Sequence, residues 1–347
     1  MKQIKAYGVL GVSQPLEPLQ ISRRDAGDDD VVIDIAYCGV CHSDIHQVRN
    51  EWGNSIFPMV PGHEIVGVVT KLGEKVKRFK IGDKVGVGCL VDSCRECSEC
   101  KEGLEQFCSK PIFTYNCLEK DNKTIVHGGY STKIVVHQDF VLRIPKNLPL
   151  DKTAPLLCAG ITTYSPLRHW NAGPGKRVAI IGLGGLGHMA VKIAHAMKAE
   201  VTVLTRTLNK KDDAIRFGAD HVYDTNDPNT FEKLSFYFDL IINTVSVKLD
   251  WGAYLGLLKR DGSMVLLGVP SEAPQVSAFP LIFGRRSLAG SLIGGIKETQ
   301  EMLDFCGKHN ITADIELIPI EKINEAYERV LKADVKYRFV IDIASLK

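Results

Sequence analysis

The stretch that decides the fold is Val178-Ala179-Ile180-Ile181-Gly182-Leu183-Gly184-Gly185-Leu186-Gly187. Its four leading apolar residues predict a buried strand, and a G-x-G-x-x-G pattern follows them directly. The next residues have helical periodicity, so we expect a helix from about Gly185 to Lys198. Glycines at a strand-to-helix turn let backbone amides approach a pyrophosphate, whereas a tight turn without a ligand is the alternative. We therefore expect a dinucleotide to contact Gly182, Gly184, Gly185, Leu186 and Gly187.

Strand-like and helix-like segments alternate from this stretch to about residue 267. Strands are expected at residues 177–181, 201–204, 239–242 and 264–267, and a second helix around residues 210–217. Such alternation predicts an α/β unit with a doubly wound parallel sheet and helices on both faces. Residues 1–150 instead contain short strand-like runs, such as 31–36 and 65–69, which glycine and proline interrupt. The chain returns to mixed strand and helix from about Leu288 and ends in a strand-like run at 337–343.

The length of 347 residues exceeds the roughly 250–300 that one hydrophobic core usually serves. It predicts two domains, a β-rich domain of residues 1–152 and 291–347 and a cofactor domain of residues 153–290. A hydrophobic fraction of 45% and a net charge of +2 predict neither a nucleic-acid partner nor a membrane. The N-terminus lacks the apolar core of a signal peptide, so we expect a cytoplasmic protein whose partner is a small molecule.

Ten cysteines in a reducing compartment are more often metal ligands or catalytic groups than disulfides. Four of them follow the spacing C-x2-C-x2-C-x7-C at Cys94, Cys97, Cys100 and Cys108. Four thiolates complete a tetrahedral shell around zinc and leave no open position, which predicts a structural site. An iron–sulfur cluster is one alternative, but the ferredoxin pattern closes with a three-residue gap and a proline, whereas here Ser109 follows a seven-residue gap. Disulfides or free thiols are the other alternative.

The end of the second expected strand, Val203-Leu204-Thr205-Arg206-Thr207, bears on the choice of dinucleotide. An NAD-binding unit carries Asp or Glu about 20 residues after the glycines, where it binds the ribose. This segment has no acid; Thr205 offers a neutral hydroxyl, and Arg206 and Lys210 offer positive charge for a 2′-phosphate. The sequence therefore favours NADP(H), the alternative being that Arg206 only covers the adenine face.

Three further segments contain candidate metal ligands, and each is a weak signal by itself. They are Cys38-Gly39-Val40-Cys41-His42-Ser43-Asp44-Ile45-His46, Pro61-Gly62-His63-Glu64-Ile65-Val66-Gly67 and Leu157-Cys158-Ala159-Gly160. Gly67 stands where the zincin motif H-E-x-x-H requires a second histidine, which excludes that class. With Gly73, the second segment instead fits the pattern G-H-E-x2-G-x5-G.

This pattern resembles that of the zinc-containing medium-chain alcohol dehydrogenases, and the resemblance covers essentially the whole chain. It is closest to the cinnamyl alcohol dehydrogenase branch in four strings: Asn50-Glu51-Trp52-Gly53, Phe113-Thr114-Tyr115-Asn116, Cys158-Ala159-Gly160-Ile161-Thr162 and Gly294-Gly295-Ile296-Lys297-Glu298-Thr299-Gln300. The resemblance implies a β-rich GroES-like catalytic domain and a Rossmann cofactor domain. It also implies two zinc ions per chain and hydride transfer between NADP(H) and an alcohol or aldehyde, either aromatic or another primary one.

Carried over by position, the resemblance implies that Cys41, His63 and Cys158 hold a catalytic zinc whose fourth position takes water or the substrate oxygen. Such a zinc lowers the pKa of an alcohol or polarises an aldehyde carbonyl. Glu64 resembles the carboxylate that approaches the metal when water leaves, with a solvated or salt-bridged acid as the alternative. Asp44 resembles the acid that orients the imidazole of His63.

Other roles also follow from the resemblance alone. Ser43 and His46 occupy the positions from which the family passes the alcohol proton to solvent, a task suited to an imidazole. An apolar substrate pocket would be lined by Trp52, Leu90, Tyr115 and Ile293, with core packing as the alternative for the two aromatic residues. Further cofactor contacts would come from Thr162, Gly268 and Val269. Residues 287–293 resemble the strand region through which family members pair, so we expect a homodimer.

Two other functions remain open at this point. A polyol dehydrogenase often has a carboxylate as its third ligand, whereas Cys158 is present here. A nicotinamide-binding protein that has lost metal and activity would share the fold, but the ligand set here is intact. The remaining cysteines, Cys38, Cys89, Cys117 and Cys306, are expected to be buried or free thiols.

Overall fold

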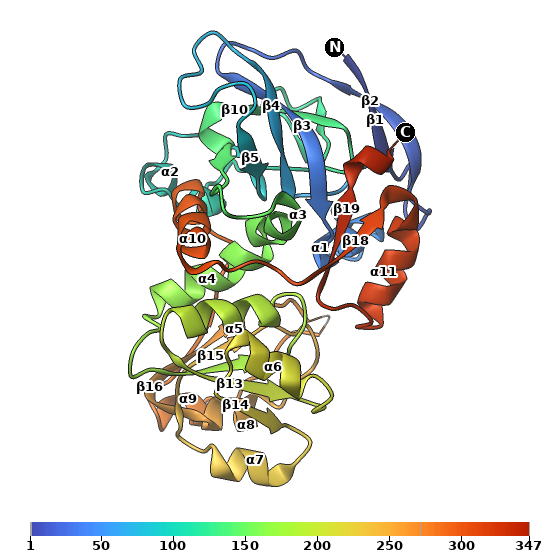
Figure 1. The fold of residues 1–347 in the computed structure, drawn as a ribbon. Coiled ribbons are helices and arrows are strands. Elements are labelled where there is room, and N and C mark those ends of the chain that lie inside the picture. Colours follow the sequence, from blue (N-terminus) through green and yellow to red (C-terminus); the bar gives the residue numbers. More distant parts are fainter. Residues whose placement is uncertain (1, 271, 347) are drawn as a thin grey trace. The chain divides into compact units, whose positions relative to one another are not determined.

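The computed structural model describes residues 2–270 and 272–346, and the chain divides into two compact units. Unit 1 comprises Met1–Cys158 and Gly294–Lys347, and unit 2 comprises Ala159–Ile293. Unit 1 thus joins the N-terminal strands, blue in Figure 1, with the C-terminal elements in red. The first segment of unit 1 ends at Cys158, six residues beyond the expected domain boundary at 152. The reason is that the 3-10 turn Ala154–Leu157 packs on the sheet of unit 1.

Unit 2 is built on a sheet of six parallel strands in the order β14-β13-β12-β15-β16-β17. Its strands are β12 (Arg177–Ile181), β13 (Glu200–Thr205), β14 (His221–Asp224), β15 (Phe238–Asn243), β16 (Leu258–Leu266) and β17 (Ser287–Gly290). The chain moves outward from β12 to β14 and then restarts at β15 on the other side of β12. This reversal places a topological switch point between β12 and β15, where doubly wound sheets bind ligands.

Local sequence accounts for the helices of unit 2. They are α4 (Ala159–His169), α5 (Gly187–Ala196), α6 (Lys211–Phe217), α7 (Pro228–Lys233), α8 (Trp251–Gly256) and α9 (Phe279–Ile282). Asp227 and Asp250 cap the N-termini of α7 and α8 by accepting backbone N–H bonds, and Gly218 ends α6 at φ +105°. The helices enclose a core in which Phe238, Ile241 and neighbouring apolar side chains are buried.

Unit 1 is centred on a seven-stranded sheet in which β3 (Asp30–Gly39) pairs with three partners. These are β4 (Ile65–Leu72), β10 (Lys133–His137) and β19 (Arg338–Asp342), all antiparallel to β3. The sheet is completed by β5 (Lys84–Val87), β11 (Leu142–Arg143) and β18 (Ile315–Pro319). The pairing of β3 with β19 brings the C-terminal segment to the strand that leads into Cys41.

Smaller elements surround this sheet. The other strands are β1 (Lys2–Gly8), β2 (Glu17–Arg23), β6 (Leu90–Asp92), β7 (Ile112–Phe113), β8 (Cys117–Leu118) and β9 (Ile125–Val126). The helices are α1 (His42–Val48), α2 (Ser98–Lys101), α3 (Leu150–Thr153), α10 (Ile296–His309) and α11 (Ile323–Leu331). Over the described part of the chain, no helix has the length and apolar character needed to cross a membrane.

Candidate functional site

A buried group of four side chains that could hold a metal ion lies in unit 1. Cys41 precedes α1, His63 and Glu64 precede β4, and Cys158 follows the 3-10 turn at 154–157. One donor atom from each lies within 4.8 Å of all the others. The sulfur atoms of Cys41 and Cys158 are 3.9 Å apart. Tetrahedral zinc with bonds of about 2.3 Å places two sulfurs about 3.8 Å apart, so the donor set fits this metal.

The charges and pKa shifts of these four side chains also favour a bound cation. Because Cys158 hydrogen-bonds to it, the Cys41 thiol has a pKa well below its usual value, while the pKa of Cys158 is raised well above its own. Burial raises the pKa of Glu64 to about 7, against the opposing effect of Arg338. The second carboxylate oxygen of Glu64 has no hydrogen-bond partner among the described residues. An anionic, buried and partly unsatisfied group of this kind is suited to a metal ion.

Glu64 is held by an arginine that the sequence analysis did not single out. The Arg338 guanidinium donates to the other Glu64 oxygen, and both residues are buried. Strand pairing explains the contact, because Val340 of β19 lies opposite Gly39, whose N–H donates to the Glu64 carbonyl. Glu64 is therefore a salt-bridged acid beside the candidate metal position, which combines the two alternatives considered for it. An arginine directly before the apolar residues 339–341 was the sequence signal that could have identified Arg338.

Asp44 lies behind His63. Its carboxylate is 3.2 Å from the Nδ1 atom of His63 and also accepts the N–H of Cys41 at 2.9 Å. Burial opposes a charged imidazole, but Asp44 raises the pKa of His63 well above its usual value. A hydrogen bond at Nδ1 leaves Nε2 as the nitrogen that faces a metal.

The expected proton path is only partly assembled around α1. The Ser43 hydroxyl is 3.7 Å from the Cys41 sulfur. His46 pairs through Nδ1 with Glu51, a residue without an assigned role in the sequence analysis, and its ring lies 5.0 Å from that of Trp52. Trp52 is 43% exposed, so it is not packed in the core of unit 1.

The other expected pocket residues differ in their surroundings. Tyr115 is buried and stacks on the ring of His63 at 5.7 Å, and Leu90 is also buried. Cys89, beside Leu90, has a lowered pKa because it hydrogen-bonds with Cys158. Ile293 belongs to unit 2 and has φ +35°. Of the expected pocket residues, Tyr115 is thus the one with a described ring contact to a candidate ligand.

The second cysteine group lies in the segment of residues 94–108 of unit 1, which we call the lobe. One sulfur from each of Cys94, Cys97, Cys100 and Cys108 lies within 4.8 Å of the others, with 3.9 Å between Cys94 and Cys100. Backbone N–H groups of Cys97 and Lys110 point at the sulfurs of Cys94 and Cys108, at 3.4 and 3.3 Å. N–H bonds from Glu96 and Cys97 lower the pKa of Cys94 to about 6. The thiolate form of Cys94 is therefore favoured, and the thiolate is the form that binds zinc.

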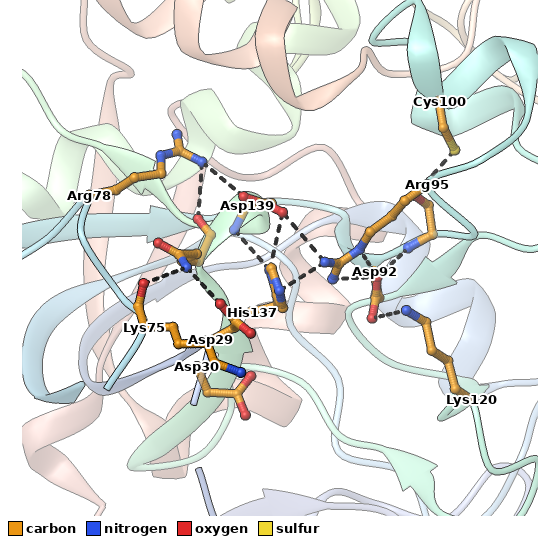
Figure 2. Close-up of polar contacts among 12 residues, drawn as sticks. Asp29, Asp30, Lys75, Arg78, Asp92, Arg95, Cys100, Lys120, His137 and Asp139 are labelled. Carbon is orange, nitrogen blue, oxygen red and sulfur yellow. Dashed lines mark hydrogen bonds and ion pairs between the residues drawn. The ribbon is translucent and has the colours of Figure 1, made fainter. Parts of the chain in front are cut away.

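Arg95 connects this lobe to the main sheet (Figure 2). Its guanidinium donates to Asp92 at 2.9 Å and to the Nε2 atom of His137 at 2.8 Å, and it lies 5.3 Å from the centre of the Phe140 ring. Asp139 extends the network from Arg95 to Arg78. Arg95 has φ +65°, so the chain between the first two cysteines takes a left-handed turn to reach these partners.

The glycine loop of unit 2 has the form expected for a dinucleotide site. Gly182 directly follows β12 and has φ +88°, a conformation that favours glycine. A Cβ on Gly187, the first residue of α5, would meet the carbonyl of Gly182 and lie 3.3 Å from the Thr244 hydroxyl. The close approach of α5 to β12 therefore requires glycine at 187, as in the dinucleotide fingerprint. Gly184, Gly185 and Leu186 lie between these two positions.

Thr205 ends β13, next to β12, and Arg206 follows it. The Thr205 hydroxyl donates to the carbonyl of Thr207 at 3.2 Å, while Arg206 is exposed and Lys210 is half-buried before α6. This strand end carries positive charge where an NAD enzyme carries an acid. The remaining expected contacts are Thr162, buried in α4, Gly268, which follows β16, and Val269, which is 64% exposed.

Comparisons with known proteins identify the family to which the chain belongs. Residues 27–146 match the alcohol dehydrogenase GroES-like domain family, and residues 185–308 match the zinc-binding dehydrogenase family. The chain is 60% identical to an NADP-dependent alcohol dehydrogenase of Mycolicibacterium smegmatis, covering 100% of both chains. It is 54% identical to an aldehyde reductase of Escherichia coli, covering 99% of both. The structure of a cinnamyl alcohol dehydrogenase from Sorghum bicolor aligns with a TM-score of 0.96 at 45% identity, over 99% of this chain and 98% of that one.

Proposed function

This chain belongs to the zinc-containing medium-chain alcohol dehydrogenases, and from that membership we propose that it interconverts aromatic and other primary alcohols with their aldehydes. It is an NADP-dependent alcohol oxidoreductase that uses zinc. The observation that carries the assignment of the site is the buried set Cys41, His63 and Cys158 with Glu64 beside it. Cys41, His63 and Cys158 supply three protein ligands and leave a fourth position for water or the substrate oxygen, as a catalytic zinc requires.

When bound there, zinc supplies Lewis acidity toward the oxygen of the substrate. The chain's own residues then have separate tasks. Asp44 orients the imidazole of His63, and Arg338 keeps Glu64 in place beside the metal position. Leu90 and Tyr115 contribute apolar surface near the ligands, which suits substrates with an apolar body.

Ser43 and His46 provide a route for the proton of the alcohol. The Ser43 hydroxyl neighbours Cys41, and His46 lies in the last turn of α1 with its side chain 22% exposed. Glu51 pairs with His46 and stabilises it while it carries the proton. The proton would therefore reach solvent through the His46–Glu51 pair.

The cofactor site is proposed to lie in unit 2. The glycines at 182 and 187 bring the N-terminus of α5 close to β12, which suits a pyrophosphate. Thr205, Arg206 and Lys210 would hold the 2′-phosphate of NADP(H). In unit 1, the four cysteines of the lobe would hold a second, structural zinc.

We further infer a homodimer and a cytoplasmic location. β17 is an edge strand of the unit 2 sheet, and the neighbouring residues Phe279, Ile282 and Phe283 are 65%, 69% and 81% exposed. An edge strand beside exposed apolar side chains suits pairing with a second copy of the chain.

Phe283→Asp should convert the dimer to a monomer in analytical ultracentrifugation, and an unchanged mass would refute this interface. The cytoplasm suits a chain with six cysteines in two metal-binding groups.

The experiment that tests the function is an alcohol and aldehyde panel run with both cofactors on protein whose zinc has been quantified. We expect two zinc ions per chain, one for each group, and NADPH oxidation that depends on an aldehyde. Cys158→Ser should abolish turnover and remove one zinc, whereas Cys117→Ser, in β8, should leave both unchanged. Faster turnover of polyols than of aldehydes would favour a polyol dehydrogenase, and protein without zinc and turnover would favour the non-enzymatic alternative.

A further inference from the structure

The carboxylate of Asp44 collects hydrogen bonds from two directions inside unit 1. It is bonded by the backbone N–H of Cys41 at 2.9 Å and of Gly62 at 3.3 Å, and by the His63 ring at 3.2 Å. The Tyr130 hydroxyl donates to the same carboxylate at 3.3 Å. Asp44 has 0% exposure, so protein donors rather than bulk water balance its charge. The two backbone donors hold Asp44 in place independently of Tyr130.

A second tyrosine continues the chain away from the metal position. The hydroxyl of Tyr327, on α11, lies 3.4 Å from that of Tyr130, and the two residues are 4% and 0% exposed. A carboxylate only accepts, so Tyr130 gives its single proton to Asp44. The oxygen of Tyr130 can then only accept, so Tyr327 donates to it. Both hydroxyl protons therefore point toward Asp44.

The Tyr130 ring is packed against the segment that carries His63. The Tyr130 N–H donates to the Pro61 carbonyl at 3.0 Å, and the Gly129 N–H donates to the Gly62 carbonyl at 2.8 Å. A Cβ on Gly62, which has φ +103°, would lie 2.7 Å from the Tyr130 ring. The hydroxyl is thus positioned by the same backbone that positions the metal ligand.

We propose that Tyr130 and Tyr327 are positioning residues that set the Lewis acidity of the catalytic zinc through Asp44 and His63, which rests on the function proposed above. A hydroxyl that donates to Asp44 draws negative charge away from its bond with His63. Without that hydroxyl, Asp44 pulls harder on the Nδ1 proton, and the metal-facing nitrogen of His63 becomes a stronger ligand. A stronger ligand leaves the zinc a weaker Lewis acid. The tyrosines therefore favour turnover over metal affinity.

The test compares Tyr130→Phe and Tyr327→Phe with a matched control. Tyr237→Phe is that control, because the Tyr237 hydroxyl donates to the Glu200 carboxylate at 2.7 Å in unit 2. Loss of a direct partner of a metal-bound histidine changes affinity or activity by about 10- to 100-fold. One bond further out, we expect kcat to fall by about 3- to 10-fold, with KM unchanged and zinc release equal or slower.

Two readouts do not depend on turnover. In cobalt-loaded protein, Tyr130→Phe should shift the visible absorption of the site at Cys41, His63 and Cys158, while the bands of the four-cysteine lobe serve as an internal control. Because Tyr327 acts only through Tyr130, the double variant should match Tyr130→Phe alone in kcat and in absorption.

Unchanged spectra and kcat in both variants would overturn the proposal. Faster zinc release accompanied by a lower melting temperature would also overturn it, since that result marks a packing role. If Tyr130→Phe does not fold, Tyr327→Phe carries the test through the same readouts. A parent protein that lacks zinc or turnover would instead refute the proposed function, so the two failures are distinguishable.

Discussion

Replacing Arg95 with alanine should loosen the four-cysteine lobe without affecting the catalytic site. Arg95 is the residue of the lobe that binds Asp92, His137 and Asp139 at once, as Figure 2 shows. Burial and the Arg95 guanidinium lower the pKa of His137, which keeps its Nε2 atom available as an acceptor. Alanine at this position would remove the side-chain interactions of Arg95 with Asp92, His137 and Asp139, so fewer polar contacts would hold the lobe against the sheet.

Three of the four interactions of the Arg95 side chain set the size of the effect, because the pair with Asp139, which is 54% exposed, adds little. The Arg95 and Asp92 side chains are 31% and 19% exposed, so this ion pair contributes about 1 kcal/mol. The hydrogen bond to His137 adds about 1 kcal/mol, and the packing on the Phe140 ring adds about 0.5 kcal/mol. A total of about 2–3 kcal/mol corresponds to lobe opening that is about 30- to 150-fold more frequent.

The assay is zinc release to a chromophoric chelator present in excess. The zinc of the lobe should leave about 30- to 150-fold faster in Arg95→Ala, because release follows lobe opening, while the catalytic zinc should leave at the parent rate. Arg78→Ala is the matched control, since Arg78 contacts Asp139 at 3.6 Å but lies outside the cysteine segment. Equal release from Arg95→Ala and the parent, or equal acceleration in Arg78→Ala, would refute this account of the lobe.

Three further predictions concern the cofactor, the proton and pH. Thr205→Asp should raise the ratio of kcat/KM with NADH to that with NADPH by about 10- to 100-fold, because a carboxylate binds the ribose hydroxyls and repels the 2′-phosphate; an unchanged ratio would contradict the cofactor assignment. His46→Ala should slow alcohol oxidation by about tenfold or more, mainly at low pH, and an unchanged pH–rate profile would remove the proton path. Burial beside Arg23 lowers the pKa of His127 from 6.5 to about 4, so its contribution to stability is complete above pH 6.5 and is lost as the pH falls toward 4. The free energy of unfolding should fall by about 2–3 kcal/mol over that range in denaturant titrations, and His127→Leu should remove this part of the pH dependence.

The features that sequence reasoning predicted well are local ones. The apolar run at 178–181 and the glycines after it predicted β12 and α5 because strand, turn and helix lie within one continuous segment. The spacing of Cys94, Cys97, Cys100 and Cys108 likewise predicted a compact group, since a short loop brings its own side chains together. The zinc ligands in three distant segments came from the resemblance to a family and not from spacing.

By itself, the sequence determined the β-rich and the alternating strand–helix segments, the glycine turn, the cysteine lobe and the absence of an acid beside Thr205. Only the tertiary structure decided which distant groups surround the catalytic ligands. Arg338 is 274 residues from Glu64, and Tyr327 is 197 residues from Tyr130. The pairing of β19 with β3 and the packing of α11 bring them there. Such contacts depend on strand order and register across the whole of unit 1, which no local pattern of residues specifies.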